Sequence, residues 1–142
     1  MGLGESNSVA KQVRISGGNS ITDAADAARA FAVENGIAGG DLSRLCVIVE
    51  ELFANLTEHG GVGPDDFVDL ALSTDSNGVR IVIVDPGQPF DPRVARPGHR
   101  RPNRGGGAGI DIVGSWATLI EYRSFEGRNQ LALLIPLRGD GL

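Results

Sequence analysis

The hydrophobic residues of this chain follow two different spacings, which predict where helices and strands lie. The alanine-rich segment Ile21–Glu34 places apolar residues at helical intervals. A second helical pattern runs from Leu45 to Leu56 and stops at Gly60-Gly61, with Asp41 or Ser43 as the expected N-cap. Each segment has one apolar face, so both are expected to pack on a core.

Alternating apolar and polar residues, bounded by turn sequences, predict the strands. The predicted strands are Val9–Ser16, Phe67–Ser73, Val79–Val84, Thr118–Phe125 and Asn129–Leu137. Turns at residues 75–78 and 126–128 join the last four into two hairpins. The resulting order predicts an α+β fold, with helices layered on one face of a mainly antiparallel sheet.

Length and composition indicate one domain over residues 1–142. A chain of 142 residues buries roughly two-thirds of its unfolded surface in a single core. Cys46 is the only cysteine and lies in an apolar run, which favours a reduced core thiol over a reactive one.

Charge and hydropathy narrow the classes of partner. A net charge of −5 gives no support to direct binding of nucleic acid or of an anionic membrane. No stretch approaches the ~20 apolar residues needed to cross a bilayer, and the first residues lack the features of a secretory signal. We therefore expect a cytoplasmic protein whose partners are proteins or small molecules.

The second predicted helix carries the first candidate site. Glu51 and Asn55 are four residues apart, so their side chains lie on the same helical face. An asparagine carbonyl is a hard oxygen ligand suited to Mg²⁺, and a carboxylate one turn away can accept a proton from a hydroxyl or water. Alone, such a pair is more often a solvated helix edge than a site.

The second candidate is Asp85, which closes an apolar strand and runs directly into a turn. An ionised carboxylate at a strand end can accept a hydrogen bond from an exocyclic amine, and Gly87 lets a planar ring approach the backbone. This combination suits adenine. The structural alternative is an Asx-type turn that only ends the strand.

The third candidate is a glycine-rich loop that opens a predicted short helix, Ile110–Trp116. Successive backbone N–H groups in such a loop favour phosphate oxygens, although a plain glycine linker has the same composition. The loop residues are Gly105, Gly106, Gly107, Ala108, Gly109 and Ile110. A Walker-type loop is excluded because the only lysine is Lys11.

Together and in this order, the three candidates resemble the nitrogen, G1 and G2 boxes of the GHKL ATPase superfamily. The segment Glu51–Gly60 is similar to the E-x-x-x-N-x-x-x-H-G form of the anti-sigma factor serine kinases. Asp85–Phe90 and Gly106–Ile110 are similar to the D-x-G-x-P/G-F and G-G-x-G-L motifs of the same group. The resemblance covers about residues 10–137 and implies a two-layer Bergerat-type α/β sandwich.

The resemblance also assigns roles. It implies that Asn55 helps to hold Mg²⁺ and contacts ATP, that Glu51 is the general base, and that Asp85 contacts the adenine amine. Gly87 would shape the adenine side. Residues 86–109 would form a lid over the phosphates, with the glycine loop at its end. Glu50 points about 100° away from Glu51 on the helix, so Glu51 is the preferred base.

Three features depart from the family pattern or stay open. A threonine that the family commonly places beside the adenine aspartate is replaced here, so Asn129 or Gln130 would substitute for it. His59 fits a hydrogen-bonding role at the helix end better than a catalytic one. Each arginine of the lid could pair with phosphate, pair with an acidic partner or remain solvated. These arginines are Arg93, Arg96, Arg100, Arg101 and Arg104.

The leading hypothesis from the resemblance is an Mg-ATP-dependent serine/threonine kinase of the anti-sigma type. It would phosphorylate a small antagonist protein and bind a sigma factor or another regulator, as a homodimer. The alternative is a catalytically silent module that switches partners in response to nucleotide. A third reading, an ATPase module detached from a larger complex, is weakened because no transducer domain follows the last strand.

Overall fold

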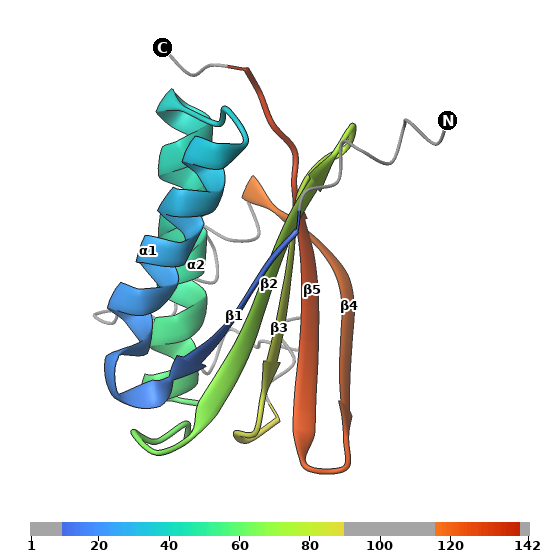
Figure 1. Ribbon diagram of the computed structural model, residues 1–142. Coiled ribbons are helices and arrows are strands. Elements are labelled where there is room, and N and C mark those ends of the chain that lie inside the picture. Colours follow the sequence, from blue (N-terminus) through green and yellow to red (C-terminus); the bar gives the residue numbers. More distant parts are fainter. Residues whose placement is uncertain (1–9, 90–115, 140–142) are drawn as a thin grey trace, which may run out of the picture.

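Helices α1 and α2 lie together on one face of an antiparallel sheet (Figure 1). The computed structural model describes residues 10–89 and 116–139. The helices are α1 (Ser20–Glu34) and α2 (Gly39–Glu58), with a short 3₁₀ turn, η2 (Gly17–Asn19), before α1. The strands are β1 (Lys11–Ser16), β2 (Phe67–Asp75), β3 (Gly78–Asp85), β4 (Thr118–Phe125) and β5 (Arg128–Ile135).

The described strands form one sheet in the order β1-β2-β3-β5-β4, and every neighbouring pair is antiparallel. The last strand in sequence, β5, therefore sits inside the sheet, between β3 and β4. The predicted α+β sandwich and its antiparallel sheet are confirmed. The strand boundaries differ from the expected ones by two residues at most. Strand β1 begins at Lys11 rather than Val9, β2 ends at Asp75 rather than Ser73, and β5 ends at Ile135 rather than Leu137.

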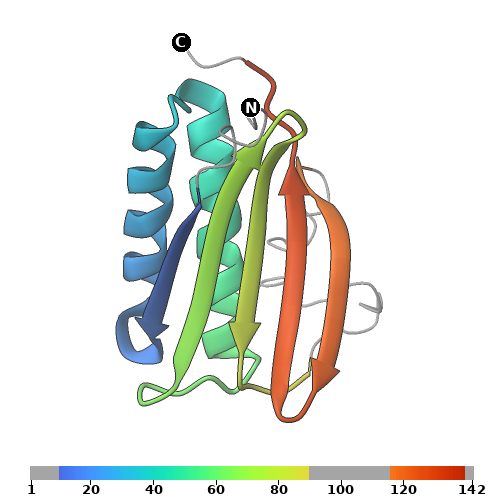
Figure 2. The ribbon, with the colours of Figure 1, turned by 45° about the vertical axis from the view of Figure 1, so that its right-hand side comes forward.

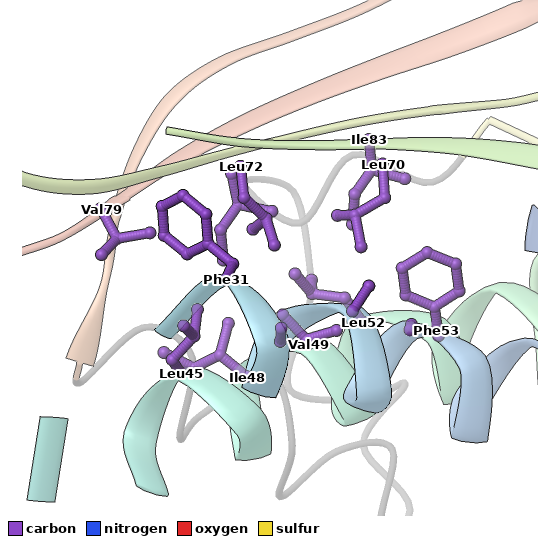
Figure 3. Close-up of a cluster of buried hydrophobic side chains, with 14 of the residues drawn as sticks. Phe31, Leu45, Ile48, Val49, Leu52, Phe53, Leu70, Leu72, Val79 and Ile83 are labelled. Carbon is purple, nitrogen blue, oxygen red and sulfur yellow. The ribbon is translucent and has the colours of Figure 1, made fainter. Parts of the chain in front are cut away.

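The core lies between the helices and the sheet, as both amphipathic patterns require. Strand β2 buries every second residue, so Val68, Leu70 and Leu72 face the helices. Helix α2 meets them with Leu45, Ile48, Val49, Leu52 and Phe53, which all lie on its buried face (Figure 3). This match of period-2 and period-3.6 apolar faces holds the two layers together.

Alanines on α1 let the helices approach each other and the sheet closely. Ala24, Ala28 and Ala32 are fully buried, and Phe31 fills the space between them and the strands (Figure 3). Cys46 is buried on α2, and burial raises the pKa of its thiol, as does Glu50, against an opposing effect of Arg29. The interpretation of Cys46 as a core thiol is confirmed.

The start of α2 differs from the prediction. The helix begins at Gly39 after Ala38, and neither Asp41 nor Ser43 is its N-cap. Asp41 instead lies in the first turn, nearly buried, and accepts backbone hydrogen bonds from Arg138 at 2.9 Å and Gly139 at 2.9 Å. The cap prediction was wrong because this carboxylate is used to hold the segment after β5.

Replacing Asp41 by asparagine should lower the free energy of unfolding by about 1–3 kcal/mol at neutral pH, because charge-assisted hydrogen bonds are lost. Burial alone would raise the pKa of Asp41, but hydrogen bonds from Arg138, Arg44 and Gly139 lower it overall. A lowered pKa means that the stabilisation is present above the pKa of the unfolded chain and is lost as the pH falls through the folded pKa.

Urea unfolding of both proteins at neutral and at strongly acidic pH measures this effect. The difference between wild type and Asp41→Asn should shrink at acidic pH. Asp26→Asn, an exposed change on α1, serves as the control and should have little effect. A difference that stays constant with pH would contradict the assigned role of the Asp41 carboxylate.

Among the described residues, no helix is long and apolar enough to span a membrane. The predicted helix Ile110–Trp116 lies outside the described residues except at Trp116, which is helical and packs against the core.

Candidate functional site

Asp85 sits at the carboxyl end of β3 and is only 5% exposed. Its Oδ1 atom accepts two hydrogen bonds, from the backbone N–H of Gly87 at 2.8 Å and from Asn129 Nδ2 at 3.0 Å. No described residue donates to Oδ2. The carboxylate is therefore held at one oxygen, and the other can accept a hydrogen bond from a ligand.

Asn129 is the partner that fixes this carboxylate. It stands directly opposite Asp85 in the pairing of β3 with β5 and is 3% exposed. Its Nδ2 also donates to the carbonyl oxygen of Gly87 at 2.9 Å. Both neighbours of this atom are acceptors, so the atom must be the amide nitrogen, with both its hydrogens used inside the protein.

Sequence reasoning left Asn129 and Gln130 as alternatives, and the structure brings Asn129 to Asp85. The alternation of side chains along the predicted strand could have distinguished the two residues. Residues 131 and 133 face the core, and Asn129 shares their face, whereas Gln130 points to the other side of the sheet.

Gly87 lies in close contact with the end of α2. The backbone N–H of Gln88 donates to the carbonyl oxygen of Gly60 at 2.6 Å. A Cβ atom on Gly87 would collide with that same carbonyl oxygen and lie 3.1 Å from a Val62 methyl carbon. The glycine is therefore required for the end of β3 to abut the end of α2. Its role on the adenine side stays a prediction.

Asn55 lies one turn before this junction, and the backbone N–H groups of His59 and Gly60 both donate to its carbonyl oxygen. Its side-chain Oδ1 is enclosed and accepts no hydrogen bond from the described residues. Buried amide oxygens normally have a partner. The residue to which the superfamily resemblance assigns Mg²⁺ therefore has a side-chain oxygen that no described residue uses.

Glu51 is four residues before Asn55 on α2 and is half-buried. Burial raises the pKa of its carboxyl group, and repulsion by Glu58 and Glu50 raises it further. A raised pKa brings a carboxylate closer to neutral pH, where a general base works best. The environment of Glu51 thus suits the role implied for it, while that role itself stays a prediction.

His59 ends α2 and lies near one of these carboxylates. Its Nε2 is 3.9 Å from Glu58 Oε1, and its side chain is 29% exposed. Among the described residues, no hydrogen bond joins it to Asp85 or Asn129. The glycine loop, Gly105 to Ile110, and the lid arginines lie outside the described residues, as does the lid beyond Pro89.

Comparison with known families agrees with this geometry. Residues 18–135 match the model of the histidine kinase-like ATPase domain, which is most of the chain. The chain belongs to this family.

A solved structure supports the same fold. The chain is similar to the histidine kinase domain from the Erythrobacter litoralis EL346 blue-light activated histidine kinase, with a TM-score of 0.50 and 17% sequence identity. The match covers 87% of this chain and 62% of that one, so the chain spans less than two-thirds of the relative. No curated protein matches the sequence. Family and fold together support ATP as the ligand of the site.

Proposed function

We propose that this domain is an Mg-ATP-dependent serine/threonine kinase of the anti-sigma factor type, which phosphorylates a small antagonist protein. The observation that carries the proposal is the arrangement on α2. Glu51, with its raised pKa, stands one turn from the unpaired oxygen of Asn55, and the same helix ends against the adenine-side turn at Gly87. On this proposal, the general base, the metal ligand and the pair that recognises adenine form one continuous site.

Magnesium fits the donor set. Asn55 supplies a hard oxygen that is enclosed and unpaired. The described residues contain no cluster of three or more His, Cys, Asp or Glu side chains that could hold a metal ion. This is consistent with Mg²⁺, which usually keeps several waters and shares the phosphates of its nucleotide. When bound, the ion would neutralise phosphate charge and orient the γ-phosphoryl group.

The residues of the chain would bind adenine and accept the proton of the substrate. Asp85 accepts a hydrogen bond from the adenine amine, held in place by Asn129. Glu51 takes the proton of a serine hydroxyl while the serine oxygen forms a bond to the γ-phosphorus of ATP. The bond between the γ-phosphorus and the bridging oxygen breaks, and ADP leaves with that oxygen. Such a transfer depends mostly on positioning and charge neutralisation, so a small site is chemically sufficient. We also propose that the domain works in the cytoplasm, binds a sigma factor or another regulator, and pairs with a second copy of the chain.

A nucleotide-responsive binding module is the second candidate. The Asp85–Asn129 pair and the Asn55 oxygen serve ATP binding whether or not a phosphoryl group moves. In that case the protein would switch partners according to the nucleotide it holds, and Glu51 would have no catalytic part.

Transfer of labelled γ-phosphate from Mg-ATP to the small antagonist protein encoded nearest to this gene separates the candidates. Wild type should label a serine or threonine of that protein, and Asn55→Ala should abolish labelling. Asn35→Ala, which removes an amide at the end of α1, is the matched control and should retain activity.

Isothermal titration calorimetry with ATP is run beside the labelling. Binding of ATP without any label on the added protein would favour the nucleotide-responsive module. Absence of ATP binding by the wild-type chain would overturn both candidates.

A further inference from the structure

The sheet has a second face that α1 and α2 do not cover. Both helices pack on one side, and the other side of the strands faces the viewer without a helix in front of it (Figure 2). Side chains alternate along each strand, so the residues between the core positions belong to this outer face. The contact of Asp69 with both Arg14 and Arg128 confirms the assignment for β1, β2 and β5.

An apolar stripe runs across the middle of the outer face. Ala71 pairs with Val82, and Val82 pairs with Ala132, so three neighbouring strands contribute small apolar side chains to one row. Val84 and Leu134 extend the stripe along β3 and β5, and both are only half-buried. A central sheet surface of this composition is typical of one that packs against another element.

Exposed aromatic side chains lie at one end of the same face. Phe67 on β2 is 52% exposed and Phe125 on β4 is 54% exposed. The guanidinium of Arg123 lies 5.3 Å from the centroid of the Phe125 ring. Aromatic residues and arginines are the side chains most enriched where proteins bind each other.

Arginines surround the stripe. The outer face carries four of them, Arg14, Arg80, Arg123 and Arg128, against the three carboxylates of Asp69, Asp75 and Glu121. Asp69 bridges Arg14 and Arg128, at 2.9 and 3.4 Å, and Glu121 pairs with Arg123 at 3.1 Å. The face therefore has a positive balance although the whole chain has a net charge of −5.

The helical layer has the opposite charge. Helices α1 and α2 together contain seven carboxylates and two arginines. Two copies that met through their outer faces would bring like charges together, which disfavours self-association there. A polyanion such as nucleic acid is a poor match as well, because most of the arginine charge is already balanced and the stripe between the arginines is apolar.

We propose that the outer sheet face binds an acidic amphipathic helix of a partner protein. A helix is the element that covers the other face of this sheet, and its apolar stripe would lie on the half-buried Ala71, Val82, Val84 and Leu134. Acidic residues beside that stripe would meet Arg80 and Arg123 on opposite sides. The inference uses no residue of the nucleotide site, so it can fail while the kinase proposal stands, and the reverse.

Fluorescence anisotropy with a labelled synthetic peptide tests the surface. The probe is a helix of about 18 residues, roughly five turns, with leucine and alanine on one face and glutamate elsewhere. The full-length chain should bind it, and the double variant Arg80→Glu/Arg123→Glu should weaken binding about tenfold or more. Arg29→Glu, an exposed reversal on α1, is the matched control and should change binding less than about twofold.

Further probes make the result specific. A peptide of the same composition in scrambled order, which has no apolar stripe, and one with lysine in place of glutamate should both bind at least about tenfold more weakly. Phe67→Ser should also weaken binding of the acidic helix. Thermal unfolding checks that each variant folds, and Arg123→Glu alone, at a side chain that is 53% exposed, gives the same test if the double variant is unstable.

Three results would overturn the proposal. The first is no binding of the acidic helix, or equal binding of the scrambled peptide. The second is equal loss of affinity in Arg29→Glu, which would indicate a general charge effect. The third is binding of a single-stranded oligonucleotide that is tighter than that of the peptide and is lost in the same variants, because the face would then serve nucleic acid.

Discussion

Exchanging Asp85 for asparagine should weaken ATP binding by about 100-fold, or roughly 3 kcal/mol, and improve binding of inosine triphosphate relative to ATP. The Oδ1 of the new side chain can keep the hydrogen bonds from Gly87 and Asn129, so its amide nitrogen would point to the ligand. A donor would then face the adenine amine, which is also a donor. The 6-oxo group of hypoxanthine offers an acceptor instead, so it suits the variant and not the wild type.

Isothermal titration calorimetry with both nucleotides measures the change. Asp75→Asn is the matched control, because Asp75 also accepts a backbone hydrogen bond two residues on, from Asn77 at 2.7 Å. It lies at the opposite end of β2 and β3, so this variant should bind ATP like wild type. If Asp85→Asn kept the wild-type affinity for ATP and the wild-type preference for ATP over inosine triphosphate, Asp85 would have no role in recognising adenine and would serve only to end the strand.

Glu51→Gln should reduce phosphoryl transfer by about 10²–10⁴-fold, the range lost when a general base is removed, and leave ATP affinity nearly unchanged. Glutamine has the size of glutamate but cannot take the proton. The rate of the wild-type enzyme should fall as the pH drops through the pKa of Glu51, and because that pKa is raised, the fall begins above the ordinary range of a glutamate. Labelling assays across pH, under saturating Mg-ATP, measure both effects.

Glu50→Gln separates this role from a general charge effect, because it removes a neighbouring carboxylate that points away from Glu51. It should retain transfer, and its pH profile should shift slightly to lower pH because one repulsive charge near Glu51 is gone. If the two variants lost activity equally, the assignment of Glu51 as the base would be wrong. If Glu51→Gln transferred phosphate normally, the nucleotide-responsive module would become the better account.

Local patterns were sufficient for most of the fold. The periodicities over residues 21–34 and 67–84 predicted α1, β2 and β3 to within two residues, because these elements bury a face that the sequence spacing shows directly. The start of α2 was not predictable in this way. Aspartate is a common N-cap residue, which is why Asp41 was expected to cap the helix. Its actual partners, Arg138 and Gly139, lie 97 and 98 residues away in the sequence, and no local pattern links them to it.

The site shows the same division. Spacing alone placed Glu51 and Asn55 on one face of a helix, and the order of motifs suggested the superfamily. The contacts that complete the site are long-range: Asn129 reaches Asp85 across a strand pairing, and Gly60 meets Gln88 where a helix end abuts a strand end. The unpaired state of the Asn55 oxygen is likewise a property of packing, which motifs do not encode.

The interior position of β5 also constrains when the nucleotide site can exist. Because β5 inserts between β3 and β4, the sheet stays open until residues 128–135 have been synthesised and have found partners more than forty residues earlier in the chain. Such distant pairings form late in folding. The same event brings Asn129 to Asp85, so a nascent chain acquires the pair proposed to recognise adenine only when its sheet is complete. ATP would then bind the completed fold and not its precursors, and would shift the folding equilibrium toward it.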